Sequence, residues 1–420
     1  MDFEWSEEEK LFRQSVNDFA QKEIAPIAEE LDAKSMCHPD LRDKMNRVFK
    51  GMADLGLLGI TIPEKYGGAG VDKPFTYACI GAEELAKADI SIALPVFYLV
   101  EASWAIILAK YGTEEAKEEI LPQVAKGEMF FGIATTEPGG GSDLSGAVTT
   151  KAEPAGDNWK INGEKVYISG VRESRELLPA GGMYFLLART GQERPSHRNL
   201  SAFLLPLKKD SPGIEPTLFE DMGRMGVSTG GFKMTDVEIP KHYLIGEENK
   251  GFYHAMEGFS NARVIIGATC LGAAEAGMNI GIDYIKQRKA FGRPIGAFEG
   301  VQFELADNYC ALEADKLLTY KAAWLTDKLN TDGSANHFEV AMSTAIAKLR
   351  APQDAIKILW DAQTWHGAFG YTKECALERG VRGVRSYTIG AEGAVAIMKT
   401  VIARELLGNE FLAYRQPPQK

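Results

Sequence analysis

The chain has 420 residues, of which 45% are hydrophobic and 25% charged, and its formal net charge is −11. This composition is typical of soluble globular proteins and excludes disordered, collagen-like and disulfide-scaffold chains. The length suggests two or three domains, and the acidic balance argues against nucleic acid as a partner.

The hydrophobic pattern predicts a helical domain over residues 1–129. Ser6 and Glu9 form a capping box and predict the start of a helix. Apolar runs at 78–88 and 100–111 predict two further helices that are buried.

The hydrophobic pattern changes in residues 130–241 and predicts an antiparallel β domain there. Apolar and polar residues alternate on both sides of Asn162-Gly163, and this pair predicts a β-hairpin turn. Further strand-like runs lie at 184–187, 200–205 and 232–239, with Pro and Gly between them.

Helical patterns return in residues 242–420. Val301, Leu305, Tyr309 and Leu312 recur at helical spacing and predict a long amphipathic helix. Three more long helices fit the ranges 255–285, 337–360 and 393–407. The chain is therefore predicted to have a helical domain, a β domain and a helical bundle, in that order.

Cysteine usage and the N-terminus predict a cytoplasmic protein. The five cysteines are scattered and form no CxxC, and the histidines lie apart, so we expect no disulfide framework and no metal site. The acidic start MDFEWSEEEK is unlike a signal peptide. No stretch appears apolar and long enough for a membrane span, so we expect no membrane partner.

Three segments suit ligand binding or catalysis, although each has an ordinary structural explanation as well. Residues 135–143 form a glycine-rich loop that could approach a flat or phosphorylated ligand, or be a surface turn. Residues 287–296 place three cations and an aromatic at a helix end, as a pyrophosphate site or as compensation of the helix dipole. Glu392, between Gly and Ala residues, could be a general base or a helix-start residue.

The order and spacing of these segments resemble the acyl-CoA dehydrogenase family over nearly the whole chain. The family motifs correspond here to Thr136–Asp143, Lys165–Ser169, Arg263, Arg288–Ile295, His366–Tyr371 and Glu392-Gly393. The resemblance implies an α+β fold with an N-terminal helical domain, a middle antiparallel β domain and a C-terminal four-helix bundle.

The resemblance also implies FAD as cofactor and an acyl-CoA thioester as substrate. The residues around the flavin would be Phe131, Ile133, Thr135, Thr136, Gly141, Ser142, Tyr167, Ile168 and Ser169. A neighbouring subunit of a homotetramer would add Arg288, Phe291 and Gln302, and Gly367, Ala368 and Phe369 would close around the dinucleotide. Ser142, Arg263 and Gly393 would contact the substrate, and an electron-transfer flavoprotein would reoxidise the flavin.

By the same resemblance, Glu392 would remove the α-proton while the β-hydrogen leaves as hydride to flavin N5, giving an enoyl-CoA. Asp89, at the end of a predicted helix, is a possible second carboxylate on the acyl wall; its ordinary alternative is a capping or solvated aspartate. Glutaryl-CoA dehydrogenases carry an arginine at the place of Ala93, so we expect no remote carboxylate on the substrate.

The small pair Gly390-Ala391 stands where the family often has two large residues, which favours a cyclic or bulky acyl group such as cyclohexane-carboxyl. A short- or medium-chain, straight or branched substrate is the alternative if Trp104, Phe97 or Tyr98 fills that space. A cyclohexene-carboxyl-CoA dehydrogenase performing a 1,4-elimination through Asp89, or an oxidase of the same fold, are further alternatives.

Overall fold

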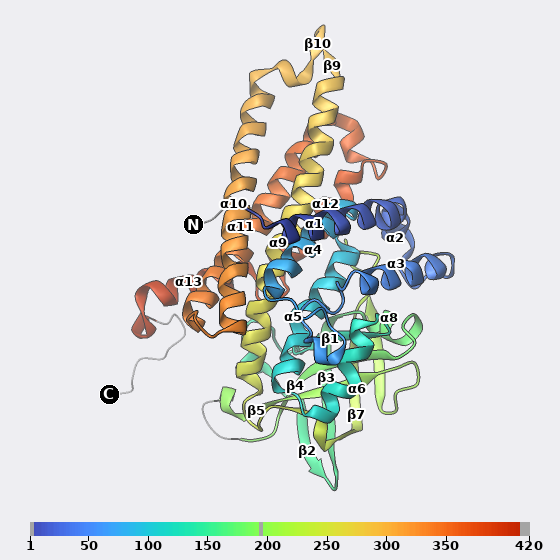
Figure 1. The fold of residues 1–420 in the computed structure, drawn as a ribbon, viewed down its shortest axis with the longest axis vertical. Coiled ribbons are helices and arrows are strands. Elements are labelled where there is room, and N and C mark those ends of the chain that lie inside the picture. Colours follow the sequence, from blue (N-terminus) through green and yellow to red (C-terminus); the bar gives the residue numbers. More distant parts are fainter. Residues whose placement is uncertain (1–3, 193–195, 412–420) are drawn as a thin grey trace.

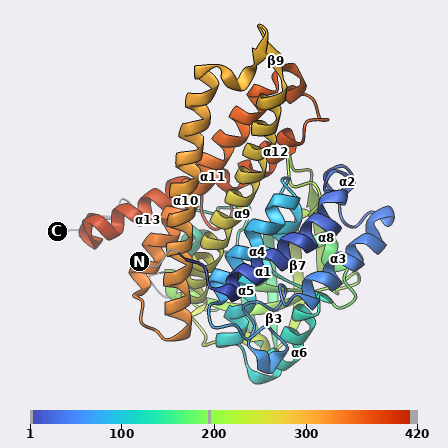
Figure 2. The same ribbon diagram turned by 45° about the horizontal axis from the view of Figure 1, so that its top comes forward.

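A computed structural model describes residues 4–192 and 196–411 of the chain. The β domain lies at one end, and the long helices of the C-terminal part extend away from it (Figure 1). The N-terminal helices lie beside both, against the flank of the bundle and over the sheet (Figures 1 and 2). The predicted fold class is confirmed.

The first domain is helical, as predicted. The Ser6 hydroxyl accepts the Glu9 N–H at 3.1 Å, and the Glu9 carboxylate accepts the Ser6 N–H at 2.8 Å, so the predicted capping box is present. Helices α4 and α5 are buried almost all round, because α4 packs along the C-terminal helix α9 and α5 lies on both α9 and the sheet. The helices are α1 (Glu7–Phe19), α2 (Ala28–Lys34), α3 (Arg42–Asp54), α4 (Pro74–Ala88), α5 (Ala93–Tyr111) and α6 (Glu114–Ala125).

The middle region is a twisted sheet in the order β6-β7-β3-β2-β4-β5-β8, with β1 pairing on β4. Most pairs are antiparallel, whereas β1 and β2 each run parallel to β4. The strands are β1 (Met129–Ala134), β2 (Lys151–Ala155), β3 (Asn158–Ser169), β4 (Gly181–Arg189), β5 (Leu200–Leu207), β6 (Ile214–Phe219), β7 (Thr229–Pro240) and β8 (Leu244–Ile245).

The hairpin predicted at Asn162-Gly163 is wrong. Strand β3 continues through this pair, and the register against β7 shifts between Ile161 and Gly163, which is a β-bulge. A Cβ at Gly163 would lie 2.4 Å from the Thr150 hydroxyl oxygen, so the glycine permits a close approach of strands rather than a turn. The actual turn joins β2 to β3 next to Gly156, whose φ is +61°.

The C-terminal helices form a bundle built on α9, which contacts α4, α5, α10 and α11. A short β9–β10 hairpin (Lys289–Ala290 and Arg293–Pro294) caps the far tip of α9 and α10 (Figure 1). The helices are α9 (Gly251–Gln287), α10 (Glu299–Thr331), α11 (His337–Trp365), α12 (Ala376–Ile389) and α13 (Val395–Leu407).

The expectation that no segment is long and apolar enough to span a membrane is wrong. Helices α5 and α9 are both long and apolar enough to cross a membrane by length and composition. Of their most apolar 18-residue stretches, 89% and 72% are buried inside the fold. Both helices are apolar all round because each has neighbours on most sides, which is the pattern of a core helix in a large domain.

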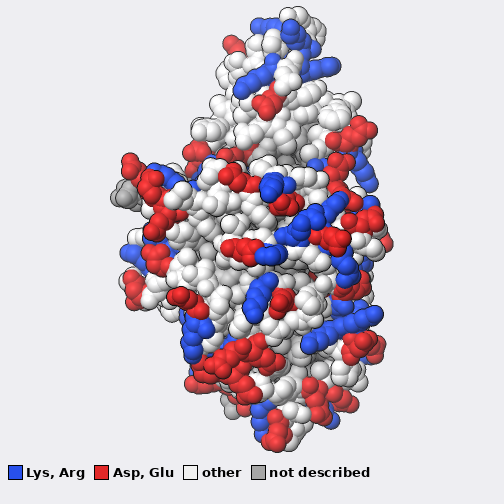
Figure 3. Space-filling model, turned by 45° about the vertical axis from the view of Figure 1, so that its right-hand side comes forward, with Lys and Arg blue, Asp and Glu red and all other residues white. Residues whose placement is uncertain are grey.

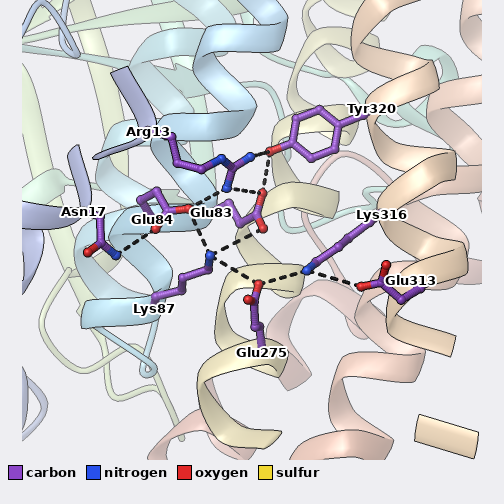
Figure 4. Close-up of polar contacts among 9 residues, drawn as sticks. All are labelled: Arg13, Asn17, Glu83, Glu84, Lys87, Glu275, Glu313, Lys316 and Tyr320. Carbon is purple, nitrogen blue, oxygen red and sulfur yellow. Dashed lines mark hydrogen bonds and ion pairs between the residues drawn. The ribbon is translucent and has the colours of Figure 1, made fainter. Parts of the chain in front are cut away.

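A network of charged side chains fastens the first domain to the bundle (Figure 4). Arg13 of α1 contacts Glu84 at 2.5 Å and Glu83 at 3.2 Å, and the Tyr320 hydroxyl of α10 donates to Glu83. Lys87 of α4 extends the network to Glu275 of α9 at 3.2 Å. Both α4 carboxylates are only 2% exposed, so each is buried with its partners in place.

Candidate active site

A cavity of about 770 Å³ lies between the β domain, α5, α9 and the segment that joins α12 to α13. The sequence-predicted residues in its wall are Ile133, Thr135, Thr136, Gly141, Ser142, Tyr167, Ser169, Arg263, Glu392 and Gly393. The fold therefore brings together residues that are more than 250 positions apart in the chain.

A buried ion pair holds the glycine-rich loop against strand β3. Lys165 is fully buried, and its ammonium contacts Glu137 at 2.8 Å and the Thr135 carbonyl at 3.2 Å. The Glu137 carboxylate also accepts the Thr149 and Thr150 N–H groups, at 2.7 and 2.9 Å. Burial opposes ionisation of Glu137, but these partners lower its pKa to about 2, whereas burial lowers the pKa of Lys165 to about 8. Both groups are therefore charged at neutral pH.

Tyr167 presents an aromatic ring to the cavity from a constrained backbone. Its φ is +61°, which is uncommon for a non-glycine residue, and the residue is 71% exposed. An exposed ring beside a cavity suits stacking against a flat ligand, so these residues fit a flavin ring system. Phe131 and Ile168, two of the predicted flavin residues, are buried and absent from the cavity wall.

Glu392 lies in a segment of three consecutive left-handed residues, with φ values of +54° at Ala391, +48° at Glu392 and +103° at Gly393. Two buried cations hold this segment by its carbonyl groups. Arg263 Nε donates to the Glu392 carbonyl at 3.0 Å, and Lys348 Nζ donates to the Gly390 carbonyl at 3.0 Å and to that of Gly393. These contacts stabilise a backbone that would otherwise be strained.

The surroundings of the Glu392 carboxyl favour a basic carboxylate. Burial raises its pKa above the ordinary value, and the Lys348, Arg263 and Arg224 charges act in the opposite direction. The Trp104 indole N–H approaches the carboxylate but forms no regular hydrogen bond with it or with another described residue. A half-buried carboxylate of raised pKa in a cavity is what a general base requires.

The structure places Asp89 outside the residues that line the cavity. Asp89 is fully buried, and its carboxylate accepts the Ser91 N–H at 3.1 Å, the Ser91 hydroxyl at 2.5 Å and the Leu94 N–H at 3.0 Å. These bonds cap the start of α5. Burial raises the pKa of Asp89, while the bonds from Ser91 and Leu94 lower it.

The remaining predicted cofactor residues gather at the far tip of α9 and α10, away from the cavity of the same chain. Arg288 and Gln302 are exposed there, and Phe291 is 97% exposed. The 367–371 turn lies at the same end, because His366 stacks on Tyr284 of α9 at 4.0 Å between ring centroids. Gly367, Ala368 and Phe369 are also exposed, so both predicted sets are accessible at this end of the bundle.

Sequence reasoning missed three residues of the site. Lys348 follows Ala347 in an apolar stretch of α11 and resembles an ordinary surface lysine in sequence, yet it is fully buried. Arg224 and Tyr387 line the cavity but belong to no motif. The apolar neighbours of Lys348 were the one sign in the sequence that this lysine lies on the buried face of a helix.

Comparisons with known proteins follow the same division of the chain. Residues 6–128, 132–237 and 249–407 match the N-terminal, middle and C-terminal domains of acyl-CoA dehydrogenase. A probable acyl-CoA dehydrogenase of Bacillus subtilis is 36% identical over 97% of this chain and its own full length, and a 3-(aryl)acrylate reductase of Clostridium sporogenes is 36% identical over 96% of this chain and 99% of its own. A glutaryl-coenzyme A dehydrogenase in complex with glutaryl-CoA superimposes with a TM-score of 0.87 at 29% identity, covering all of both chains.

Proposed function

Because the chain belongs to the acyl-CoA dehydrogenase family of FAD-dependent oxidoreductases, we propose that Glu392 removes the α-proton of an acyl-CoA thioester with a cyclic or bulky acyl group, such as cyclohexane-carboxyl. The observation that carries the proposal is the position of Glu392 in the cavity wall, on a backbone segment held by Arg263 and Lys348.

The reaction converts the Cα–Cβ single bond into a double bond. Glu392 takes the α-proton, and the β-hydrogen leaves with its electron pair. FAD held by the cavity residues would supply the acceptor for this hydride. No hydrogen bond from the Glu392 N–H is found among the described residues, so this group is free to donate to the thioester oxygen. Such a bond would stabilise the negative charge that develops on that oxygen and so acidify the α-carbon.

The proposed FAD site has two parts from two subunits. In one subunit, Ile133, Thr135, Thr136, Gly141, Ser142, Tyr167 and Ser169 line the cavity that would receive the flavin ring. The exposed tip of α9 and α10 of a neighbouring subunit would supply Arg288, Phe291 and Gln302, with Gly367, Ala368 and Phe369 beside them. Basic side chains gather at this tip (Figure 3), which suits a pyrophosphate. A homotetramer completed in this way is part of the proposal.

The shape of the cavity supports a ring-bearing acyl group. The small residues Gly390 and Ala391 lie in its wall, whereas Phe97 and Tyr98 are fully buried and do not line it. Trp104 is also outside the wall, although its indole N–H approaches the Glu392 carboxylate. Phe97 packs against Phe49 and Phe130 instead. The name of the Clostridium sporogenes relative, a 3-(aryl)acrylate reductase, also refers to a ring next to the reacting bond. We propose a cytoplasmic location and an electron-transfer flavoprotein as the acceptor.

The test is anaerobic bleaching of the purified yellow enzyme by a panel of acyl-CoA thioesters. We expect cyclohexane-carboxyl-CoA to give a higher kcat/KM than butyryl-CoA or octanoyl-CoA. Ala391→Tyr should reverse this order by filling the wall beside Glu392, while Ala396→Tyr, on the exposed side of α13, is the matched control. A straight-chain thioester that outpaces the cyclic one about tenfold or more would contradict the substrate assignment, and rapid oxygen consumption would favour the oxidase alternative.

A further inference from the structure

A second polar group lies in the cavity wall, apart from Glu392 and the glycine-rich loop. Arg224 belongs to the turn between β6 and β7, and its side chain, which is 14% exposed, lines the cavity. Its φ of +57° places a non-glycine residue in the left-handed region. Such a conformation persists only where the surrounding contacts enforce it.

Two glycines allow this turn to pack closely against the neighbouring helices. A Cβ at Gly223 would lie 2.4 Å from the carbonyl carbon of Arg382 in α12, and a Cβ at Gly226 would lie 2.7 Å from the Cβ of Ala93 in α5. The turn therefore packs directly on the first residue of α5. Arg224 lies two residues before Gly226, in the same turn that packs on Ala93, a position that offers only a methyl group.

The polar atoms of this region are poorly satisfied. The Arg224 guanidinium makes two long contacts among the described residues, from Nη2 to the Thr229 hydroxyl at 3.5 Å and to Asp221 at 3.7 Å, and its Nε has no partner there. The hydroxyl of Tyr387, which is 1% exposed, also lacks a partner among these residues. Both residues line the same cavity, and burial raises the pKa of Tyr387 while the Arg224 charge lowers it.

Buried donors without partners are rare in native proteins, and a pair of them in one cavity wall indicates a ligand that is bound during function. The adjoining wall is apolar, with Val96, Leu99 and Val100 of α5. An apolar acyl group would leave both donors unpaired, at the cost of their desolvation.

We propose that Arg224 and Tyr387 bind an oxygen acceptor on the acyl group, located beyond its β-carbon. The inference rests on the proposed function, because it takes the cavity to hold the acyl group of a thioester. A ketone, a hydroxyl and a carboxylate share the required chemistry, and Asp221 offsets part of the arginine charge. We expected no remote carboxylate on the substrate because position 93 lacks an arginine. Under this proposal Arg224 supplies a guanidinium from another element, so that reason no longer holds.

The test compares thioesters in matched pairs. Cyclohexane-carboxyl-CoA is paired with its 4-oxo and 4-hydroxy derivatives, and hexanoyl-CoA with adipyl-CoA, which carries a terminal carboxylate. We expect the wild-type enzyme to prefer the oxygenated member of at least one pair by about tenfold or more in kcat/KM, the usual effect of hydrogen bonds to a charged donor. The pair with the largest ratio identifies the acceptor.

Arg224→Met should lower this ratio about tenfold, and Tyr387→Phe, which keeps the ring and its packing, should lower it by a smaller factor. Arg385→Met, which changes an exposed α12 arginine outside the cavity wall, should leave the ratio unchanged. If Arg224→Met does not fold, Tyr387→Phe carries the same test.

Equal ratios in the wild type and both variants would overturn the inference, as would a general wild-type preference for the unsubstituted thioesters. Loss of FAD from Arg224→Met with an unchanged ratio would also overturn it, because the arginine would then serve the cofactor. If no thioester bleached the wild-type flavin, the proposed function itself would fail, and the inference with it.

Discussion

The guanidinium Nε of Arg263 donates a 3.0 Å hydrogen bond to the backbone carbonyl of Glu392. This bond fixes the peptide of the proposed base from one side, while Lys348 holds the carbonyls of Gly390 and Gly393. Because both cations act on the backbone, the Glu392 carboxyl group stays available for chemistry. A base held in this way needs little reorganisation when its substrate arrives.

Replacement of the base should separate binding from chemistry. We expect Glu392→Gln to retain bound FAD and to bind acyl-CoA, and to lose the rate of flavin reduction by about 10²–10⁴-fold or more, because the amide accepts no proton. Anaerobic stopped-flow absorbance measures this rate, and the flavin spectrum before mixing is the control. A variant that reduces its flavin nearly as fast as the wild type would remove Glu392 from this role.

The pH dependence of flavin reduction should reveal the effect of the Lys348 charge on Glu392. The rate should rise with pH, because Glu392 acts as a base only when ionised and burial raises its pKa. Lys348→Met removes a cation that lowers this pKa, so the rise should move to higher pH. The measurement is the reduction rate constant across the acidic and neutral range.

Lys357→Met is the matched control for this shift. Lys357 lies on the same helix, is 56% exposed and pairs with Asp361 at 2.5 Å, far from a role at the base. Its pH profile should coincide with that of the wild type. A Lys348→Met profile that is lower in rate but unmoved in pH would mean that the lysine is structural only.

The buried pair Glu137–Lys165 should behave as one unit in a double-mutant cycle. Glu137→Gln and Lys165→Met each leave one buried charge without its partner, so each should lower the free energy of unfolding by about 3–5 kcal/mol. The double variant should lose clearly less than the sum, because it leaves no charge behind. Urea denaturation measures these values, and FAD content follows the loosening of the loop. Strictly additive losses would show that the pair does not couple.

Asp89→Asn should affect stability rather than the reaction of saturated substrates. The amide nitrogen cannot accept the N–H and O–H groups that the carboxylate now accepts, so the cap of α5 weakens by about 1–2 kcal/mol. The thermal midpoint and the flavin reduction rate with a saturated thioester test the two halves of this prediction. An unchanged midpoint combined with loss of activity towards cyclohexene-carboxyl-CoA would favour the 1,4-elimination alternative.

The elements that the sequence predicted well are those fixed by local interactions. The capping box at Ser6 and Glu9 involves residues within one turn, and it is present. The turn signal at Asn162-Gly163 is equally local, but β3 and β7 pair along their whole length and override it. Tertiary pairing outweighs a two-residue preference when the alternative would leave long strands without partners.

The same reasoning explains the site. Family motifs mark Glu392 and the 135–143 loop as candidates, and both contribute to the cavity wall, while their roles stay predictions. Lys348, Arg224 and Tyr387 could not be predicted, since their roles arise only from tertiary contacts. Arg224 and Tyr387 meet in one cavity wall, and Lys348 of α11 holds the carbonyl of Gly390 in that wall. A pair of glycines flanking Arg224 was visible in the sequence, but the surfaces that they approach were not.

The charged network of Figure 4 has a consequence for biosynthesis. Glu83 accepts a hydrogen bond from the hydroxyl of Tyr320, which lies 237 residues further along the chain. At a ribosomal rate of about 5–20 residues per second, α4 must wait roughly 12–50 s before this partner exists. During that interval its apolar faces, which later pack on α9, have no permanent cover. The nascent N-terminal segment is therefore expected to be a client of ribosome-associated chaperones until the bundle emerges.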